Sequence, residues 1–167
     1  MTHHVEQSIR INVPASKVWE VLGDFASIER YSASVDRSPL LPGKTEGVGT
    51  KRICHFYNKT SVVEEITRFE DGKSFDIVLT EYSMPLKSLH ATMGVRAVNN
   101  TSSEIYMSMD YVVKFGPIGW VMGALLMRPV MNKVIKGTLK GLAFHSSTGK
   151  NVVTQLPDGH EMAAIIV

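Results

Sequence analysis

The sequence has very little cysteine, and this scarcity excludes several kinds of site. Cys54 is the single cysteine among 167 residues, so an internal disulfide is impossible and a cysteine-rich zinc site has no ligands. Histidine pairs with His-x-x-x-His spacing are absent, as are a Gly-x-Ser-x-Gly nucleophile elbow and a phosphate-binding glycine loop. We therefore predict no metal and no cofactor.

Long apolar runs are missing as well. The longest uncharged stretch near a predicted helix, residues 115–127, is too short to cross a bilayer, which takes about 20 residues. Residues 1–14 contain charges and lack the apolar stretch of a secretory signal. We therefore expect a cytoplasmic protein without a membrane-spanning helix.

Acidic residues are absent from one part of the chain. The net charge is only +2, yet residues 114–150 contain six Lys or Arg residues and no Asp or Glu. Arg128, Lys133, Lys136 and Lys140 fall on a predicted helix, where a solvated outer face is the favoured interpretation. Contact with an anionic membrane, to which Trp120 would contribute, is the second. We predict no nucleic-acid partner, because aromatic residues do not interleave with these charges.

Alternating apolar and polar residues predict most of the fold. Residues 5–13 alternate with the period of a half-buried strand, and two short helical segments follow within residues 16–31. Five further alternating segments lie within residues 48–114, separated by turn signals such as Asn58-Lys59. Such short turns predict an antiparallel meander with one apolar face.

A long helix is predicted near the end of the chain. Apolar residues recur at intervals of three and four from Ile118 to about Ser147. Pro129 lacks an amide hydrogen, so we expect a kink or a break there. Residues 1–149 are interpreted as a single ligand-binding domain and residues 150–167 as a C-terminal tail.

Several segments resemble a known family. Residues 9–22 resemble the opening of the polyketide cyclase/dehydrase and START-related lipid-transfer superfamily (SRPBCC), which includes birch-pollen-allergen-like proteins. Residues 47–52, Val63-Glu64 and parts of residues 115–142 look like later landmarks of that superfamily. The resemblance implies an α+β helix-grip fold: a curved antiparallel sheet of about seven strands wraps a long C-terminal helix, with two short helices after the first strand. It also implies an apolar cavity between sheet and helix.

Methionine is frequent in the segments expected to border this cavity. Its flexible, polarizable side chain suits a pocket that adapts to varied apolar ligands, although gap-filling in the core is the alternative for any single methionine. Glu64 is the favoured polar contact. The predicted ligand-binding residues are Val13, Glu64, Phe75, Ile77, Leu79, Met93, Met107, Met109, Tyr111, Met122 and Leu125.

Acid-base chemistry has three candidate residues, Glu64, His55 and Arg52. A charged group that reaches into a dry cavity must be paired, and such a pair could orient a ligand or move a proton. A two-residue turn at Asn58-Lys59 would place His55 and Glu64 on one face and Arg52 on the other, whereas a longer turn would reverse this. The sequence leaves open which of these residues face the cavity.

The sequence therefore favours a protein that binds, transfers or senses a small hydrophobic or amphipathic molecule, such as a lipid, a polyketide-like compound or a quinone. The alternative is an enzyme of the polyketide cyclase or dehydratase type that uses an inward acid-base pair. The expected partner is the small hydrophobic molecule, with peripheral membrane contact as a further option. The chain is expected to be a monomer or a homodimer.

Overall fold

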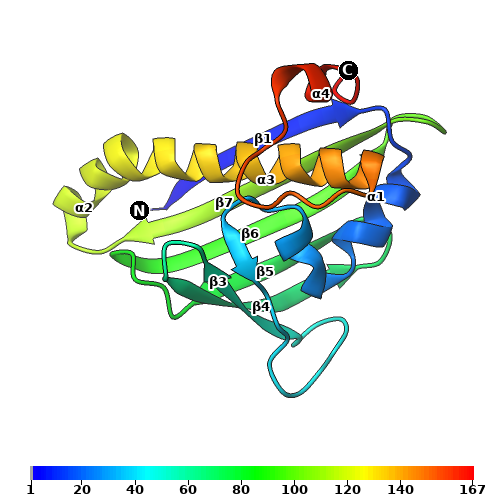
Figure 1. The fold of residues 1–167 in the computed structure, drawn as a ribbon. Coiled ribbons are helices and arrows are strands. Elements are labelled where there is room, and N and C mark those ends of the chain that lie inside the picture. Colours follow the sequence, from blue (N-terminus) through cyan, green and yellow to red (C-terminus); the bar gives the residue numbers. More distant parts are fainter. Residues whose placement is uncertain (1) are drawn as a thin grey trace.

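A seven-stranded sheet forms the centre of the computed structural model, which describes residues 2–167 (Figure 1). The strand order is β1-β7-β6-β5-β4-β3-β2, and every neighbouring pair is antiparallel. The strands are β1 (His3–Ile11), β2 (Val35–Arg37), β3 (Lys51–Phe56), β4 (Ser61–Glu70), β5 (Ser74–Thr80), β6 (Leu86–Ala97) and β7 (Ser103–Val113). This confirms the predicted antiparallel meander, with β1 joined to its far edge.

Side-chain alternation gives the sheet one apolar face. Along β7 every second residue from Ser103 to Val113 is buried, and the residues between them are partly exposed. The register with β6 places Met93 opposite Met107 and Ala91 opposite Met109. Paired residues on neighbouring strands project to the same side of a sheet, so these methionines form one surface.

Two short helices connect β1 to β2. They are α1 (Ala15–Leu22) and the 3-10 helix η1 (Phe25–Arg30), as the sequence predicts. The Asp24 side chain accepts a hydrogen bond from the backbone N–H of Ala26 and so caps η1.

One helical segment in three parts follows the sheet. It consists of α2 (Gly116–Met122), the π-helical turn η2 (Gly123–Met127) and α3 (Arg128–Thr148). The interruption expected at Pro129 takes the form of this π-helical turn, after which Pro129 occupies the first turn of α3, where no amide donor is needed. Within residues 2–167, none of the helices has the length and apolar character that a membrane crossing requires.

Helix α3 lies along the apolar face of the sheet and completes the helix-grip fold (Figure 1). Ile135, Leu139 and Leu142 are buried on its inner side. A Cβ atom at Gly141 would overlap the carbonyl oxygen of Tyr31, so only glycine allows this approach of α3 to the segment after η1.

Residues 150–167 pack against the rest of the molecule. The backbone N–H of Val152 donates to the carbonyl oxygen of Arg30 at 2.8 Å, and that of Asn12 donates to Ile165 at 2.9 Å. The short helix α4 (Gly159–Ala163) contributes Met162 to the core. This segment therefore covers the end of β1 and belongs to the same hydrophobic core.

Candidate functional site

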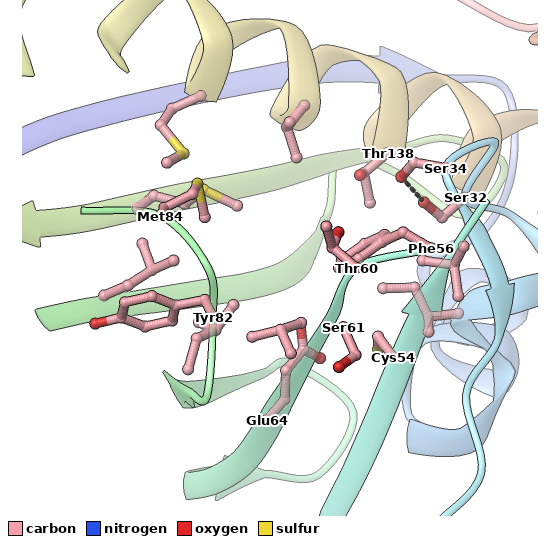
Figure 2. A pocket seen from close by; sticks show the side chains of 18 of the residues that line it. Ser32, Ser34, Cys54, Phe56, Thr60, Ser61, Glu64, Tyr82, Met84 and Thr138 are labelled. Carbon is pink, nitrogen blue, oxygen red and sulfur yellow. Dashed lines mark hydrogen bonds between the residues drawn. The ribbon is translucent and has the colours of Figure 1, made fainter. Parts of the chain in front are cut away.

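A cavity of about 550 Å³ lies between the apolar face of the sheet and α3 (Figure 2). Small-molecule sites usually have volumes of about 300–1,000 Å³. Three loops surround it: residues 32–34 before β2, the β3–β4 connection around Asn58, and residues 82–84 between β5 and β6. The sheet and α3 supply its apolar wall, which consists of Ile77, Leu79, Leu89, Met93, Met107, Met109, Val130, Met131 and Val134.

The structure brings six of the predicted ligand-binding residues together. Glu64, Ile77, Leu79, Met93, Met107 and Met109 line the cavity. They come from four neighbouring strands, β4 to β7, and meet because those strands pair in register. Their role in ligand binding remains a prediction, but their common location follows directly from the period-two pattern.

The other five predicted residues do not line the cavity. Phe75 is packed edge-on against Phe25, with ring centroids 5.7 Å apart, and Val13 is buried beyond the end of β1. Tyr111 is fully buried and its hydroxyl donates to the carbonyl oxygen of Gly123 at 2.9 Å. The two helix residues, Met122 and Leu125, also lie outside the cavity wall.

The helix residues lie elsewhere because glycines occupy the inner side of α2 and η2. Gly119 and Gly123 are buried, and a Cβ atom on either would overlap Lys114 or His3 respectively. Most of the larger apolar residues are turned outward as a result, and Leu125 is 69% exposed, whereas Met122 is half-buried against the core without lining the cavity. In this part of the helix, small residues mark the side that faces the sheet, and most of the large apolar residues mark the side that faces solvent.

An ion pair between Arg52 and Glu64 is built into the cavity wall. The two residues oppose each other on β3 and β4, and Arg52 Nε and Nη2 lie 2.6 and 2.5 Å from Glu64 Oε2. Arg52 Nη1 also donates to the carbonyl oxygen of Phe25. The pair is deeply buried, with Arg52 1% and the Glu64 side chain 8% exposed. The hydrogen bonds from nitrogen donors go to Oε2, the Cys54 thiol is also within hydrogen-bonding reach of the carboxylate, and Glu64 lines the cavity.

The pairing register settles the facing of the catalytic candidates. Ile53 opposes Val63 rather than Glu64, so the β3–β4 connection is longer than two residues. Arg52 and Glu64 consequently share the inner face. His55 opposes Ser61 and does not line the cavity, so the structure does not bring it together with the other two candidates.

The groups around the ion pair are held neutral. Burial, followed by the nearby Glu64 carboxylate, raises the pKa of the Cys54 thiol to about 12. Burial also raises the pKa of the Tyr31 hydroxyl well above its ordinary value. For Arg52, burial alone would lower the pKa, but the Glu64 carboxylate raises it above the ordinary range. This part of the wall therefore carries one fixed charge pair and no reactive thiolate.

Hydroxyl groups form a second polar region of the wall. Ser32 and Ser34 are hydrogen bonded to each other, with their Oγ atoms 3.1 Å apart, and Thr138 of α3 lies beside them (Figure 2). Thr60 and Tyr82 also line the cavity. These loop residues were missed at the sequence level because periodicity does not position loops. The α3 residues Val130, Val134 and Thr138 carried a usable signal, their spacing of four.

No group of three His, Cys, Asp or Glu side chains within the described residues is arranged to hold a metal ion. The polar groups that line the cavity are the Arg52–Glu64 pair, Asn58 and a few hydroxyls, and the rest of the wall is mostly apolar.

A family model places the chain among known proteins. The family described as polyketide cyclase / dehydrase and lipid transport matches residues 2–146. The chain belongs to this family. No curated protein sequence matches it. The resemblance found in the sequence is thereby confirmed, and the polyketide cyclase and lipid transport family gives the chain a coarse function as a ligand-binding or polyketide cyclase-like protein of the SRPBCC superfamily.

Solved structures share the helix-grip fold at low sequence identity. The Zhui aromatase/cyclase from Streptomyces sp. R1128 is 13% identical with a TM-score of 0.70, covering 88% of this chain and 94% of that one. A norcoclaurine synthase from Thalictrum flavum, in complex with a transition-state analogue, is 14% identical with a TM-score of 0.66, covering 89% and 98%. The XoxI protein from Bacillus cereus is 18% identical with a TM-score of 0.70, covering 83% and 92%. Identities this low establish the fold alone.

Proposed function

We propose that this member of the polyketide cyclase and lipid transport family binds a small amphipathic molecule and carries or senses it. The observation that supports the proposal is the cavity itself, whose wall is mostly apolar and has the Arg52–Glu64 pair, Asn58 and a few hydroxyls as its polar groups. The apolar part of the ligand would lie against Met93, Met107 and Met109. A hydroxyl or amine group of the ligand would donate to the Glu64 carboxylate.

Desolvation supplies the binding energy in this proposal. Enclosing roughly 300 Å² of apolar ligand surface contributes about 7 kcal/mol at 25 cal/mol per Å², before the cost of association. The ion pair adds little affinity, because its charges are already satisfied by each other. Its role is selection, since a ligand without a donor would desolvate the Glu64 carboxylate without a compensating hydrogen bond.

A carrier is favoured over an acid-base enzyme by the geometry of the ion pair. If Glu64 took a proton from a substrate, the Arg52 guanidinium would lose the charge that compensates it in a buried site. The runner-up, a cyclase or dehydratase, is supported by two observations: the Glu64 carboxylate lines the cavity, and the Zhui aromatase/cyclase shares the fold.

A cavity-filling substitution tests the proposal directly. Met107→Trp is expected to fold normally and to abolish binding of the uncharged fluorescent probe N-phenyl-1-naphthylamine, because the new ring occupies the cavity. The matched control is Ile105→Trp, two residues away on the same face of β7 but outside the cavity wall. It has no space for the ring and is expected to destabilise the protein by about 1–3 kcal/mol. Equal probe binding by the wild type and Met107→Trp would refute the proposal.

The natural ligand is accessible by native mass spectrometry of protein purified without detergent, followed by solvent extraction. A carrier returns the extracted molecule unchanged after incubation with fresh protein. A polyketide cyclase-like enzyme converts it, and Glu64→Gln would then stop the conversion while the probe still binds. Extraction of no small molecule, together with absent probe binding, would contradict both functions.

A further inference from the structure

Helix α2 and the turn η2 present large apolar side chains to solvent. Ile118 is 73% exposed, Leu126 is 64% exposed, and no part of residues 2–167 covers them. Figure 1 shows this region at one end of the molecule, where the long helix begins. We call these residues the apolar cap: Phe115, Ile118, Trp120, Val121, Leu125 and Leu126.

The outward orientation of the apolar cap is fixed by the fold. Gly119 approaches the carbonyl oxygen of Lys114, and Gly123 approaches His3. The helix therefore cannot rotate to place its large apolar side chains where these glycines lie. His3 also stacks between Tyr111 and Trp120, with ring centroids 5.1 and 5.7 Å apart. The apolar cap therefore cannot turn inward to bury itself without losing these contacts.

Phe115, the first residue of the apolar cap, has an unfavourable backbone conformation. Its φ is +77°, a left-handed conformation that costs a non-glycine residue about 1 kcal/mol or more, and Gly116 follows at +55°. The aromatic side chain of Phe115 gains no burial in return, because it is 67% exposed. Contact with something outside the described chain would account for both costs.

Basic residues adjoin the apolar cap on both sides. Lys114 precedes it, and Arg128, Lys133, Lys136 and Lys140 follow it along the exposed side of α3. None of these five forms an ion pair with an acidic side chain of residues 2–167. The surface beside the apolar cap is thus positively charged and uncompensated.

We propose that the apolar cap and these five basic residues dock on the surface of an anionic lipid membrane. Tryptophan and aliphatic side chains insert at the headgroup level, and each Lys or Arg near an anionic surface contributes about 1 kcal/mol. A protein partner would need both a complementary apolar groove and an acidic rim. A lipid surface supplies apolar and anionic groups without a matched shape, which suits a cap that protrudes.

Docking in this way would bring the cavity to the lipid surface. Val130 and Val134 belong to the cavity wall and are also exposed on α3, next to the apolar cap. An amphipathic ligand would then exchange between membrane and cavity without crossing bulk water. This exchange rests on the proposed function, whereas docking itself does not require the cavity.

Vesicle flotation tests the docking. The full chain is expected to float with phosphatidylcholine vesicles that contain phosphatidylglycerol, and not with pure phosphatidylcholine, and the binding should weaken at high salt. Ile118→Ser/Leu125→Ser/Leu126→Ser should lower the affinity at least tenfold. Its control, Val48→Ser/Val98→Ser/Val153→Ser, removes exposed apolar residues elsewhere and should change nothing.

The charges are tested separately. Lys133→Gln/Lys136→Gln/Lys140→Gln should reduce affinity by about fivefold per charge. The matched control, Lys17→Gln/Lys59→Gln/Lys150→Gln, neutralises exposed lysines elsewhere and should retain binding. In a Trp19→Phe background, Trp120 emission should shift to shorter wavelength on anionic vesicles.

Three results would overturn the proposal: no flotation of the wild type, equal flotation with neutral vesicles, or unchanged binding by both triple variants. Wild-type dimers in sedimentation that dissociate in the Ile118→Ser/Leu125→Ser/Leu126→Ser variant would identify a second copy as the occupant instead. Met107→Trp separates the two proposals, because it should lose probe binding and still dock.

Discussion

The two ends of the helical segment that runs from α2 to α3 use the same residue types in opposite ways. Near its C-terminal end, Leu139 and Leu142 are buried and Gly141 allows the backbone of Tyr31 to approach. Near its N-terminal end, glycines face the sheet and most of the large apolar residues face solvent. The C-terminal end, which we call the stable end, therefore contributes to folding stability. The N-terminal end, which we call the exposed end, presents apolar residues to solvent, and folding stability alone does not explain this.

Loss of one member of the Arg52–Glu64 ion pair in the cavity wall should give the largest change in stability. Glu64→Leu leaves the buried Arg52 charge uncompensated and should lower the free energy of unfolding by about 3–5 kcal/mol. Arg52→Leu/Glu64→Leu should recover most of that loss, because two apolar residues replace the pair. Urea unfolding followed by circular dichroism measures both.

An exposed pair provides the control for this prediction. Arg68 Nε lies 2.6 Å from Asp76 Oδ2, but the two side chains are 48% and 32% exposed. Asp76→Asn should therefore cost less than about 1 kcal/mol. If the single and double variants of the buried pair lose equal stability, the charge-burial argument is wrong.

Glycine substitution within α3 should give the next largest effect. Gly141→Val forces side-chain atoms onto the Tyr31 carbonyl and should destabilise the fold by about 3 kcal/mol. At Gly137, one turn earlier, a Cβ atom would meet only Leu156 Cδ1 at 3.7 Å. Gly137→Ala should therefore stabilise by about 0.5–1 kcal/mol through helix propensity. Thermal unfolding of both variants checks the contrast, which fails if they shift the melting temperature in the same direction.

Alkaline pH should destabilise the protein through Cys54, which is buried beside the Arg52–Glu64 pair. Below pH 9 the Cys54 thiol is protonated in both states, while above pH 9 the unfolded chain loses the proton that the folded chain keeps up to about pH 12. Stability should therefore fall as pH rises, by about 1 kcal/mol at pH 10. Cys54→Val should remove most of this decline and leave the smaller part that comes from Tyr31, whose pKa is also raised by burial. A wild-type stability that is flat between pH 8 and about pH 10 would contradict the raised pKa of the thiol.

Most of the sheet could be predicted from the sequence, because its strands are half buried and alternate cleanly. The methionines of β6 and β7 fell on the cavity wall for the same reason. The register between β3 and β4 could not be predicted from the sequence, because it depends on the length of the loop that connects these two strands. A difference of one residue there decides whether Arg52 or His55 joins Glu64.

The helix shows a second limit of sequence analysis. The pattern of large apolar residues correctly predicted the inner side of α3, including Ile135 and Leu139. In α2 and η2 the same rule placed Met122 and Leu125 at the cavity, because a glycine gives no hydrophobic signal. Met122 is instead half-buried against the core outside the cavity wall, and Leu125 faces solvent. Paired glycines four residues apart, such as Gly119 and Gly123, were the available sign that a backbone approaches closely on that side.

Leu125 and Leu142 allow the same exchange to be made at the two ends of the helical segment. Leu125→Ser should change the free energy of unfolding by less than about 0.5 kcal/mol, because the wild-type side chain is exposed and leaves no cavity when removed. Leu142→Ser, the same exchange at the stable end, should cost at least about 2–5 kcal/mol, since that leucine is buried and the new hydroxyl would lack a partner. Denaturant unfolding of the two variants side by side measures the difference. A large loss in Leu125→Ser would mean that the residue packs against the chain itself, and the exposed end would then need no outside partner. A negligible loss leaves a leucine that contributes nothing to folding, and a contact outside the chain becomes the physical reason for its position.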